Sequence, residues 1–365
     1  MSSQVRMRLL PSARCLFDEP VQLKVSGLRS RQVVTMRARS ADERGVVFSS
    51  SATYRADGRG EIDLDRDPSL SGSYVGVEPM GLLWSMRPDI LHKRFHKDKT
   101  ITPHVVKLSV HEGEGEGRML AEATNERLVM GEGVSRVSVK EGNFEGVLFT
   151  PPGKKFSSLC FDHIYSLLVG SKGVGILSRS KASDIALSIA AFVPGVEATM
   201  WINGCSANMV TPLYYKNKQL LPVLLYDKKK VVHTSSGAGI IKYVLNSTLT
   251  EENKATLIPI EQAKGHFLFV AAENDLNLDA KAYMEQLVER LKRHGKENFE
   301  CVSYPGAGHY LEPPYIPFCP SSFHGVVCMP VLWGGDPRGH PAAEVLVWKK
   351  IQDYFRTRLS CDAAQ

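Results

Sequence analysis

The spacing of hydrophobic residues changes near residue 135, and this change constrains the fold more than any other feature of the chain. Before it, short runs of alternating apolar residues lie between turn residues, as in VQLKV (21–25), VTMRA (34–38) and VVKLSV (105–110). Alternation with a period of two is typical of strands that bury one face. Since no convincing long helix interrupts these runs, residues 1–135 are predicted to form an antiparallel β-sandwich domain.

Strands and helices are predicted to alternate through the second domain, residues 136–365, after a stretch at 131–143 in which glycines and charges interrupt the pattern. This alternation is typical of a mostly parallel sheet with helices on both faces. The predicted strands are 144–149, 173–177, 197–204, 266–275 and 299–306, and the predicted helices are 163–170, 183–193, 280–295 and 340–355.

The composition is that of an ordinary soluble globular protein. The chain has 365 residues, of which 43% are hydrophobic and 23% charged, and its net charge of +6 is not gathered into a dense Lys/Arg run. The mild positive charge suits an anionic small-molecule substrate or a mixed, solvated surface. No apolar run approaches the roughly 18 residues of a membrane span. We therefore predict no nucleic-acid partner and no membrane-spanning segment.

Cysteine usage and the N-terminal sequence bear on the compartment. The seven cysteines are odd in number and form no C-x-x-C pair, so neither a disulfide framework nor a zinc site is expected. The first 17 residues carry three arginines and no acid but have no long apolar region, and they are interpreted as part of the fold. A reducing compartment, with the cytosol as the default, is the resulting expectation.

Ser180 stands between a predicted strand and a predicted helix, in the stretch GVGILSRSKAS (173–183). In a nucleophile elbow, the serine occupies such a sharp turn, and the N–H of the next residue faces the developing oxyanion. Ser178 and Ala182 take the flanking positions, where glycine is usual, and both are small. Ser180 is therefore a candidate nucleophile. The alternative is a polar loop whose serine caps the helix.

Asp275 and His309 are candidates for the other two members of a catalytic triad. Asp275 ends the predicted strand HFLFVAAEND, and His309 lies in PGAGHY, just after the predicted strand FECVSY. The chain order Ser, acid, His is that of α/β-hydrolases. Taken singly, Asp275 could be a helix cap and His309 a loop residue, but together with Ser180 they predict a triad.

Other reactive side chains are weaker candidates. Glu273 is an alternative acid, and Cys205 lacks an adjacent base. Structural roles are expected for the remaining histidines considered, namely His163, His266, His324 and His340.

Four long segments of the chain are distinctive, namely DEPVQLKVSGL, ATYRADGRGEIDLDRDPSLSGSYVGVEPMGLLWSM, GHYLEPPYIPFC and LWGGDPRGHPAAEVLVWKKIQDYF. They resemble the family of type I acyl-CoA thioesterases and bile acid-CoA:amino acid N-acyltransferases. The resemblance runs from about residue 7 to about residue 357. It implies an immunoglobulin-like β-sandwich domain followed by an α/β-hydrolase domain.

The same resemblance implies an activity. Members with a serine nucleophile hydrolyse acyl-CoA to a free fatty acid and CoA, whereas members with cysteine are amidating acyltransferases, so Ser180 implies a hydrolase. Ser180, Asp275 and His309 match the family's triad, and the backbone N–H of Lys181 would be one oxyanion donor. Basic side chains would contact the CoA phosphates, and no metal or other cofactor is implied. Relatives occupy the cytosol, mitochondria and peroxisomes.

Two features depart from the family pattern. The elbow reads S-R-S-K-A instead of carrying glycines on both sides of the serine. Near residues 153–162, about ten residues stand where the family has a strand-helix-strand block with the loop that usually gives the second oxyanion donor. A catalytically impaired, shortened relative that acts by binding acyl-CoA or a protein is therefore the alternative to an active thioesterase.

Overall fold

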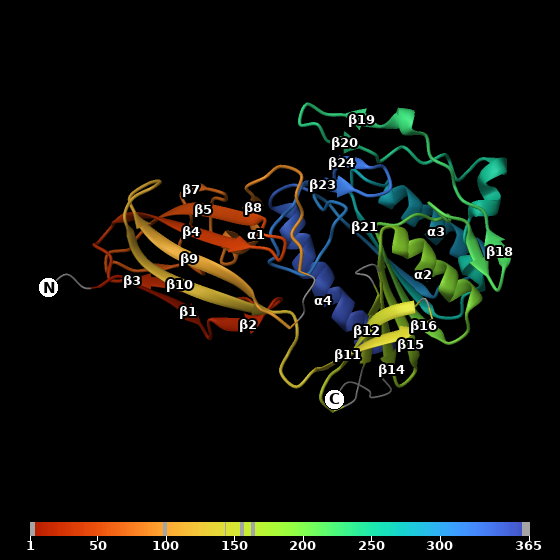
Figure 1. Ribbon diagram of the computed structural model, residues 1–365, viewed down its shortest axis with the longest axis horizontal. Helices are drawn as coiled ribbons and strands as arrows, with labels where there is room; N and C mark the ends of the chain where they lie inside the picture. Colours follow the sequence, from red (N-terminus) through yellow and green to blue (C-terminus); the bar gives the residue numbers. More distant parts are fainter. Residues whose placement is uncertain (1–3, 98–100, 143, 154–156, 162–164, 360–365) are drawn as a thin grey trace. The chain divides into compact units, whose positions relative to one another are not determined.

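The computed structural model describes residues 4–97, 101–142, 144–153, 157–161 and 165–359. The chain divides into two compact units (Figure 1). Unit 1 consists of Met1–Glu132 and Glu312–Ser322, and unit 2 consists of Gly133–Leu311 and Phe323–Gln365. His163, for which a structural role is expected, lies outside the described residues, and so does Cys361, one of the seven cysteines.

Unit 1 is built from two β-sheets. One has the strand order β1-β3-β6, and the other has the order β2-β10-β9-β4-β5-β7, with β8 also paired to β5. All the pairs are antiparallel except β2 with β10, which is parallel. The elements are β1 (Arg6–Leu10), β2 (Arg14–Leu16), β3 (Gln22–Ser26), β4 (Val33–Ala41), β5 (Val47–Arg55), β6 (Ile62–Asp63), β7 (Ser71–Gly72), α1 (Gly81–Trp84), β8 (Arg87–Pro88), β9 (His104–Glu112) and β10 (Met119–Leu128).

The core of unit 1 follows the alternation predicted from the sequence. Val34, Met36 and Ala38 of β4 are buried, and so are Val106 and Leu108 of β9, the strand paired with it. Successive side chains of a strand point to opposite faces, so these residues line the single face that the sheet turns to the core.

The chain returns to unit 1 long after its first 132 residues, a feature that the sequence pattern did not indicate. Within Glu312–Ser322, Tyr315, Ile316 and Cys319 pack against the hydrophobic core of unit 1. The backbone N–H of Phe318 donates to the Trp84 carbonyl over 3.2 Å. Unit 1 is therefore completed by a segment distant in sequence.

Unit 2 centres on an eight-stranded sheet with the order β11-β12-β13-β14-β15-β16-β21-β22. Its strands are β11 (Ser135–Glu141), β12 (Phe144–Thr150), β13 (Ser157–Phe161), β14 (Tyr165–Gly170), β15 (Gly173–Arg179), β16 (Val196–Ile202), β21 (His266–Ala272) and β22 (Phe299–Tyr304). Its longer helices are α2 (Lys181–Phe192), α3 (Ala280–Arg293) and α4 (Gly339–Leu359).

Helices cover both faces of this sheet (Figure 1). Phe267 and Phe269 of β21 share a buried cluster with residues of α2 and α3. Leu268 and Val270, which alternate with them, belong to a separate cluster with Val347 and other residues of α4. Alternate side chains of β21 therefore pack into the hydrophobic core on each face of the sheet. This explains why the sequence of β21 is a continuous apolar run.

Smaller elements make up the rest of unit 2, although the first two residues of the strand Ser321–His324 are assigned to unit 1. The strands β19, β20, β24 and β23 form one small sheet, and β17 pairs with β18. Their bounds, with those of three 3-10 helices, are β17 (Leu213–Tyr215), β18 (Lys218–Leu221), η1 (Lys228–Lys230), β19 (Val232–His233), β20 (Gly239–Ile240), η2 (Glu251–Thr256), η3 (Ile260–Gln262), β23 (Ser321–His324) and β24 (Met329–Leu332).

Two predictions for unit 2 were wrong. The sheet is mixed and not mostly parallel, because the pairs from β11 to β15 are antiparallel and only those from β15 to β22 are parallel. The helix expected at 163–170 is instead the strand β14. Only Ser171 and Lys172 separate β14 from β15, and a link of two residues allows a hairpin but not a crossover, so this pair is antiparallel. The spacing of so short an apolar run does not distinguish strand from helix.

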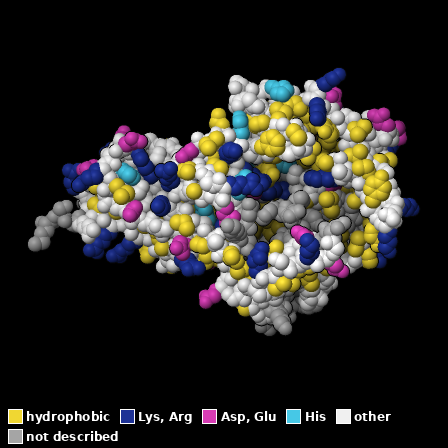
Figure 2. Space-filling view, in the orientation of Figure 1, with side chains coloured by type: hydrophobic (Ala, Val, Ile, Leu, Met, Phe, Trp, Pro, Cys, Tyr) yellow, Lys and Arg dark blue, Asp and Glu magenta, His cyan; other side chains and the backbone are white. Residues whose placement is uncertain are grey.

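Surface features are varied on the face seen in Figure 2, where basic and acidic side chains are interspersed with hydrophobic ones. No helix among the described residues is long and apolar enough to cross a membrane.

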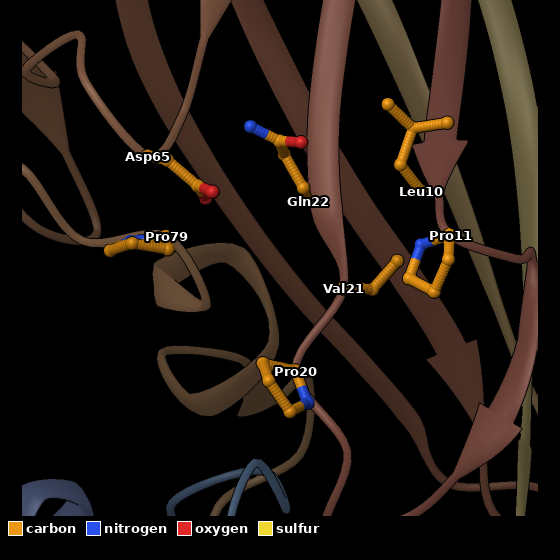
Figure 3. Close-up of a pocket in the computed structure, with 7 residues that line it drawn as sticks. All are labelled: Leu10, Pro11, Pro20, Val21, Gln22, Asp65 and Pro79. Carbon is orange, nitrogen blue, oxygen red and sulfur yellow. The ribbon is translucent and has the colours of Figure 1, made fainter.

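A pocket of about 380 Å³ lies in unit 1 (Figure 3). Its lining residues are Leu10, Pro11, Pro20, Val21, Gln22, Asp65 and Pro79, and none of these seven is a nucleophile or a histidine.

Arg127 provides a test of how unit 1 is held together. Its fully buried guanidinium donates to the carbonyl oxygens of Phe17 over 2.7 Å and Glu19 over 2.8 Å. Arg127→Met keeps most of the volume but leaves the buried Phe17 carbonyl oxygen, and that of Glu19, without their charged donor. We expect the free energy of unfolding to fall by about 3 kcal/mol, measured by urea denaturation. Arg39→Met, at an exposed position of β4, is the control and should change stability by less than about 0.5 kcal/mol. Equal stability of the two variants would contradict this account.

Candidate functional site

Ser180 lies at the sharp turn between β15 and α2. Its backbone has φ of 57° and ψ of −131°, a conformation that non-glycine residues adopt at a cost of about 1–3 kcal/mol. Two backbone hydrogen bonds hold it there: the Ser180 N–H donates to the Ile202 carbonyl over 2.9 Å, and the Ser183 N–H donates to the Ser180 carbonyl over 2.9 Å. Strain of this kind is concentrated where a side chain must be presented for chemistry.

The residues that replace the usual glycines fit the turn. Ser178 is buried, and its hydroxyl donates to the Met200 carbonyl over 2.8 Å. Ala182 is fully buried in the first turn of α2. A hydroxyl with an acceptor and a single methyl group are therefore accommodated on either side of Ser180.

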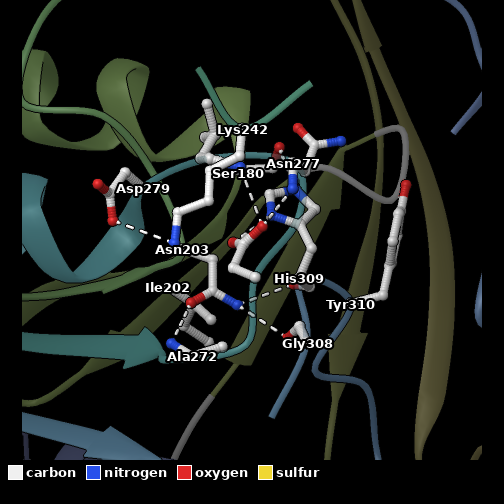
Figure 4. Close-up of polar contacts among 12 residues, drawn as sticks. Ser180, Ile202, Asn203, Lys242, Ala272, Asn277, Asp279, Gly308, His309 and Tyr310 are labelled. Carbon is white, nitrogen blue, oxygen red and sulfur yellow. Dashed lines mark hydrogen bonds and ion pairs between the residues drawn. The ribbon is translucent and has the colours of Figure 1, made fainter. Parts of the chain in front are cut away.

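The structure brings Ser180, His309 and Asp275 into one line of contacts, partly visible in Figure 4. His309 Nε2 lies 2.8 Å from Ser180 Oγ, and His309 Nδ1 lies 2.7 Å from Asp275 Oδ2. An ionised carboxylate can only accept, so Nδ1 carries the proton and Nε2 of the neutral ring accepts from the serine hydroxyl. This arrangement can withdraw a proton from Ser180.

Backbone amides fix the Asp275 carboxylate. Its Oδ1 accepts hydrogen bonds from the N–H groups of Asn277 over 2.7 Å and Leu278 over 2.9 Å. With Oδ2 on His309, both oxygens are engaged, and the side chain is only 1% exposed. Asp275 therefore has one orientation in which to hold the imidazole.

Asn203 links the ends of β16 and β21 to the loop that carries His309. The sequence reasoning missed this residue. It follows β16 directly and is fully buried. Its Nδ2 donates to the His309 carbonyl over 2.8 Å, and its Oδ1 accepts from the Ala272 N–H over 2.7 Å (Figure 4). The signal available in the sequence was an Asn-Gly pair after an apolar strand, which indicates only a turn.

Trp333 is a second residue that sequence reasoning missed. Its carbonyl accepts the backbone N–H of His309 over 2.8 Å, and its indole stacks on the imidazole with ring centroids 5.6 Å apart. Trp333 lies in the LWGGDPRGH segment, so the sequence singled out the segment but not the contact.

The weaker candidates lie in other environments. Glu273 Oε1 accepts from Lys281 and Ser303 over 2.9 Å and 2.7 Å. Cys205 is fully buried, and burial raises the pKa of its thiol to about 12. A nucleophilic thiolate is therefore disfavoured at Cys205, and Glu273 is engaged elsewhere.

Three of the histidines for which structural roles are expected, His340, His324 and His266, lie within the described residues. His340 Nδ1 accepts from the Gly308 N–H over 2.9 Å, so it stabilises the loop that carries His309. Burial lowers the pKa of His324 to about 4. Burial and the nearby Arg358 lower the pKa of His266.

Lys181 begins α2, so its backbone N–H belongs to the first helical turn, whose N–H groups have no acceptors within the helix. Its side chain is tied back: Nζ lies 2.6 Å from Asp184 Oδ2 and also donates to the Met209 carbonyl. The Met209 N–H donates to the same Asp184 oxygen over 2.8 Å. This ion pair, of which only the Asp184 side chain is fully buried, links α2 to the loop after β16.

No group of three or more His, Cys, Asp or Glu residues that could hold a metal ion occurs within the described ranges.

Asp184 generates a pH-dependent prediction. Burial raises the pKa of its carboxyl to about 6, although Lys181 opposes the shift. Between pH ~4 and 6 the folded protein retains a proton that the unfolded chain has released, so this contribution to stability is present at low pH and lost as pH rises through 6. Relative to Asp184→Asn, the wild type should lose up to about 3 kcal/mol between pH 4 and 6. Urea denaturation of both proteins across this range measures the difference, and a constant difference would contradict the prediction.

Family comparisons cover both parts of the chain. Residues 18–141 match the family described as Acyl-CoA thioester hydrolase/BAAT N-terminal region. Residues 167–361 match the family described as BAAT / Acyl-CoA thioester hydrolase C terminal. The second match includes Ser180, Asp275 and His309.

Individual relatives align over nearly the whole chain. Human mitochondrial acyl-coenzyme A thioesterase 2 is 36% identical over 405 residues, covering 96% of this chain and 84% of the relative. Mouse peroxisomal succinyl-coenzyme A thioesterase is 35% identical over 404 residues, covering 96% of each. Both matched lengths exceed the 365 residues of this chain, so the relatives have residues that it lacks. The chain belongs to the BAAT/acyl-CoA thioester hydrolase family.

Proposed function

We propose that this protein hydrolyses the thioester bond of acyl-CoA, giving a free fatty acid and CoA, with Ser180 as the nucleophile. The observation that carries the proposal is the continuous contact from Ser180 Oγ through His309 to Asp275, on a strained turn. The names of the relatives support the substrate class, since they are acyl-coenzyme A thioesterases.

The proposed reaction has two halves. Ser180 Oγ attacks the thioester carbonyl carbon while His309 Nε2 takes the hydroxyl proton, and the C–S bond then breaks as His309 returns that proton to the departing thiolate. A water molecule, deprotonated by the same nitrogen, then attacks the acyl-serine ester. The ester C–O bond breaks as His309 gives the proton to Ser180 Oγ, and the fatty acid is released. The Asp275 carboxylate orients the imidazole and stabilises its protonated form. These steps use only side chains and water, so the proposal requires no metal or other cofactor.

Charge on the carbonyl oxygen must be stabilised during both halves. We assign one donor to the backbone N–H of Lys181, at the start of α2, where the helix dipole also favours negative charge. The family's usual second donor lies in the block that is replaced here by about ten residues near 153–162. Loss of one donor typically lowers kcat by about 10² to 10³, so we expect a slower enzyme than the relatives that carry the block.

The fold assignment is part of the same proposal. We assign unit 2 to the α/β-hydrolase class, because Ser180, Asp275 and His309 each follow one of the parallel strands of its sheet. We assign the two-sheet unit 1 to the immunoglobulin-like class. The cytosol is the proposed compartment, although relatives are named mitochondrial and peroxisomal.

Substitution of the nucleophile tests the function directly. Ser180→Ala removes the attacking oxygen, and we expect thiol release from a long-chain acyl-CoA to fall by at least about 10⁴-fold. The measurement is the rate of free-thiol formation by the purified 365-residue chain.

Ser188→Ala is the matched control. Ser188 is a buried serine on the same helix whose hydroxyl donates to the Asp184 carbonyl over 2.8 Å, so its loss should change stability but not chemistry. If wild type and Ser180→Ala are equally inactive while both unfold cooperatively, the hydrolase proposal fails and a role in binding acyl-CoA or a protein takes its place.

A further inference from the structure

Trp333 faces the candidate general base. Its indole and the His309 imidazole are stacked at an interplanar angle of 17°, with centroids 5.6 Å apart. The indole is 3% exposed, and it belongs to a small hydrophobic cluster with Ile241, Val244 and Val331. The imidazole therefore meets a carboxylate at its Nδ1 edge and an aromatic face on its flat side.

The backbone around Trp333 fixes this arrangement. His309 N–H donates to the Trp333 carbonyl, Gly334 forms a bridge with Asp275, and Gly335 N–H donates to the Asn274 carbonyl over 3.2 Å. Gly334 has φ of +79°, and a Cβ there would lie 1.9 Å from the Asn274 carbonyl oxygen. Only glycine allows this approach. Residues 333–335 thus hold the indole against the loop that carries His309 and the loop that carries Asp275.

A stacked indole attracts the protonated imidazole of His309 more strongly than the neutral imidazole. The face of an aromatic ring carries negative charge density, which attracts a cation lying within about 6 Å of the ring centre. Neutral imidazole is attracted less. Since His309 becomes protonated in both halves of the proposed reaction, the indole face stabilises the transition states more than the ground state.

We propose that Trp333 is a positioning residue that stabilises the imidazolium form of His309 through the face of its indole. The proposal rests on the proposed function for its catalytic consequence. It concerns a residue that touches the base and not the substrate.

Several other side chains lie near the imidazole, and each makes further contacts. Asp275 holds Nδ1, and the Tyr310 ring meets the imidazole edge-on with centroids 5.7 Å apart, while Arg179 Cζ lies 4.4 Å from the centre of the Tyr310 ring. The His324 ring lies 5.5 Å from the Trp333 ring, and with a pKa of about 4 it is neutral at pH 5 and above. His340 contacts the loop through the Gly308 N–H. The Tyr310 ring also meets the Trp333 indole edge-on, with centroids 4.5 Å apart, so a variant that keeps a ring at position 333 is needed beside one that removes it.

The test compares Trp333→Phe and Trp333→Leu with wild type by pH profiles of kcat and kcat/KM between pH 5 and 9. Leucine keeps an apolar side chain without a π face, and we expect kcat to fall about tenfold with KM little changed. The acidic limb of kcat/KM should shift to lower pH by about half a unit to one unit, because the protonated ring loses stabilisation. Phenylalanine retains a weaker face and should restore part of both effects.

Trp201→Leu is the matched control, since Trp201 is equally buried in unit 2 but packs against Phe269 on the sheet face covered by α2 and α3. It should lower the melting temperature and leave the acidic limb unchanged. An unshifted acidic limb in Trp333→Leu, or an equal shift in Trp201→Leu, overturns the proposal.

A second readout does not depend on turnover. The pKa of His309, followed by NMR of the imidazole in a Ser180→Ala background, should be lower when Trp333→Leu is added than with the native indole. If wild type shows no serine-dependent hydrolysis but this difference is found, the hydrolase proposal fails and the stacking proposal stands. If hydrolysis is found and the pKa of His309 is the same in both proteins, the stacking proposal fails alone.

Discussion

Parallel pairing of β15, β16, β21 and β22 is the constraint on which the rest of unit 2 depends. The carboxyl ends of parallel strands meet at one edge of a sheet, and Ser180, Asn203, Asp275 and His309 each follow one of these four strands. Residues separated by as many as 129 positions therefore come within hydrogen-bond distance. The sheet supplies this proximity, and the hydrogen bonds of Asn203 and the amides around Asp275 refine it.

The predictable part of the structure was the part set by local chemistry. The alternation of apolar and polar residues predicted most strands, and the position of Ser180 between a predicted strand and a predicted helix made it a candidate. Asp275 and His309 were candidates because each residue type stood just after a strand. Asn203 and Trp333 could not be found in this way, because their roles arise from contacts with segments far along the chain. The antiparallel half of the sheet was missed for a related reason, since one short apolar run fits either period.

Buried polar groups give the site its fixed geometry. Asn203 is fully buried and Asp275 is 1% exposed, and hydrogen bonds account for both oxygens of the carboxylate and for both ends of the amide. Leaving such a group without a partner would cost about 1–3 kcal/mol, so alternative arrangements of the loops are disfavoured. The same chemistry accommodates Ser178 where a glycine is usual, because Met200 offers its hydroxyl an acceptor.

The return of Glu312–Ser322 to unit 1 has a consequence for biosynthesis. Domains generally fold in order as the chain leaves the ribosome. Unit 1 departs from that order, because Tyr315 and Ile316 pack against its core only after most of unit 2 has been translated. The first 132 residues contain all of the fully buried core of unit 1, but the contacts of Glu312–Ser322 are added late, so unit 1 is complete only once residue 322 has been synthesised.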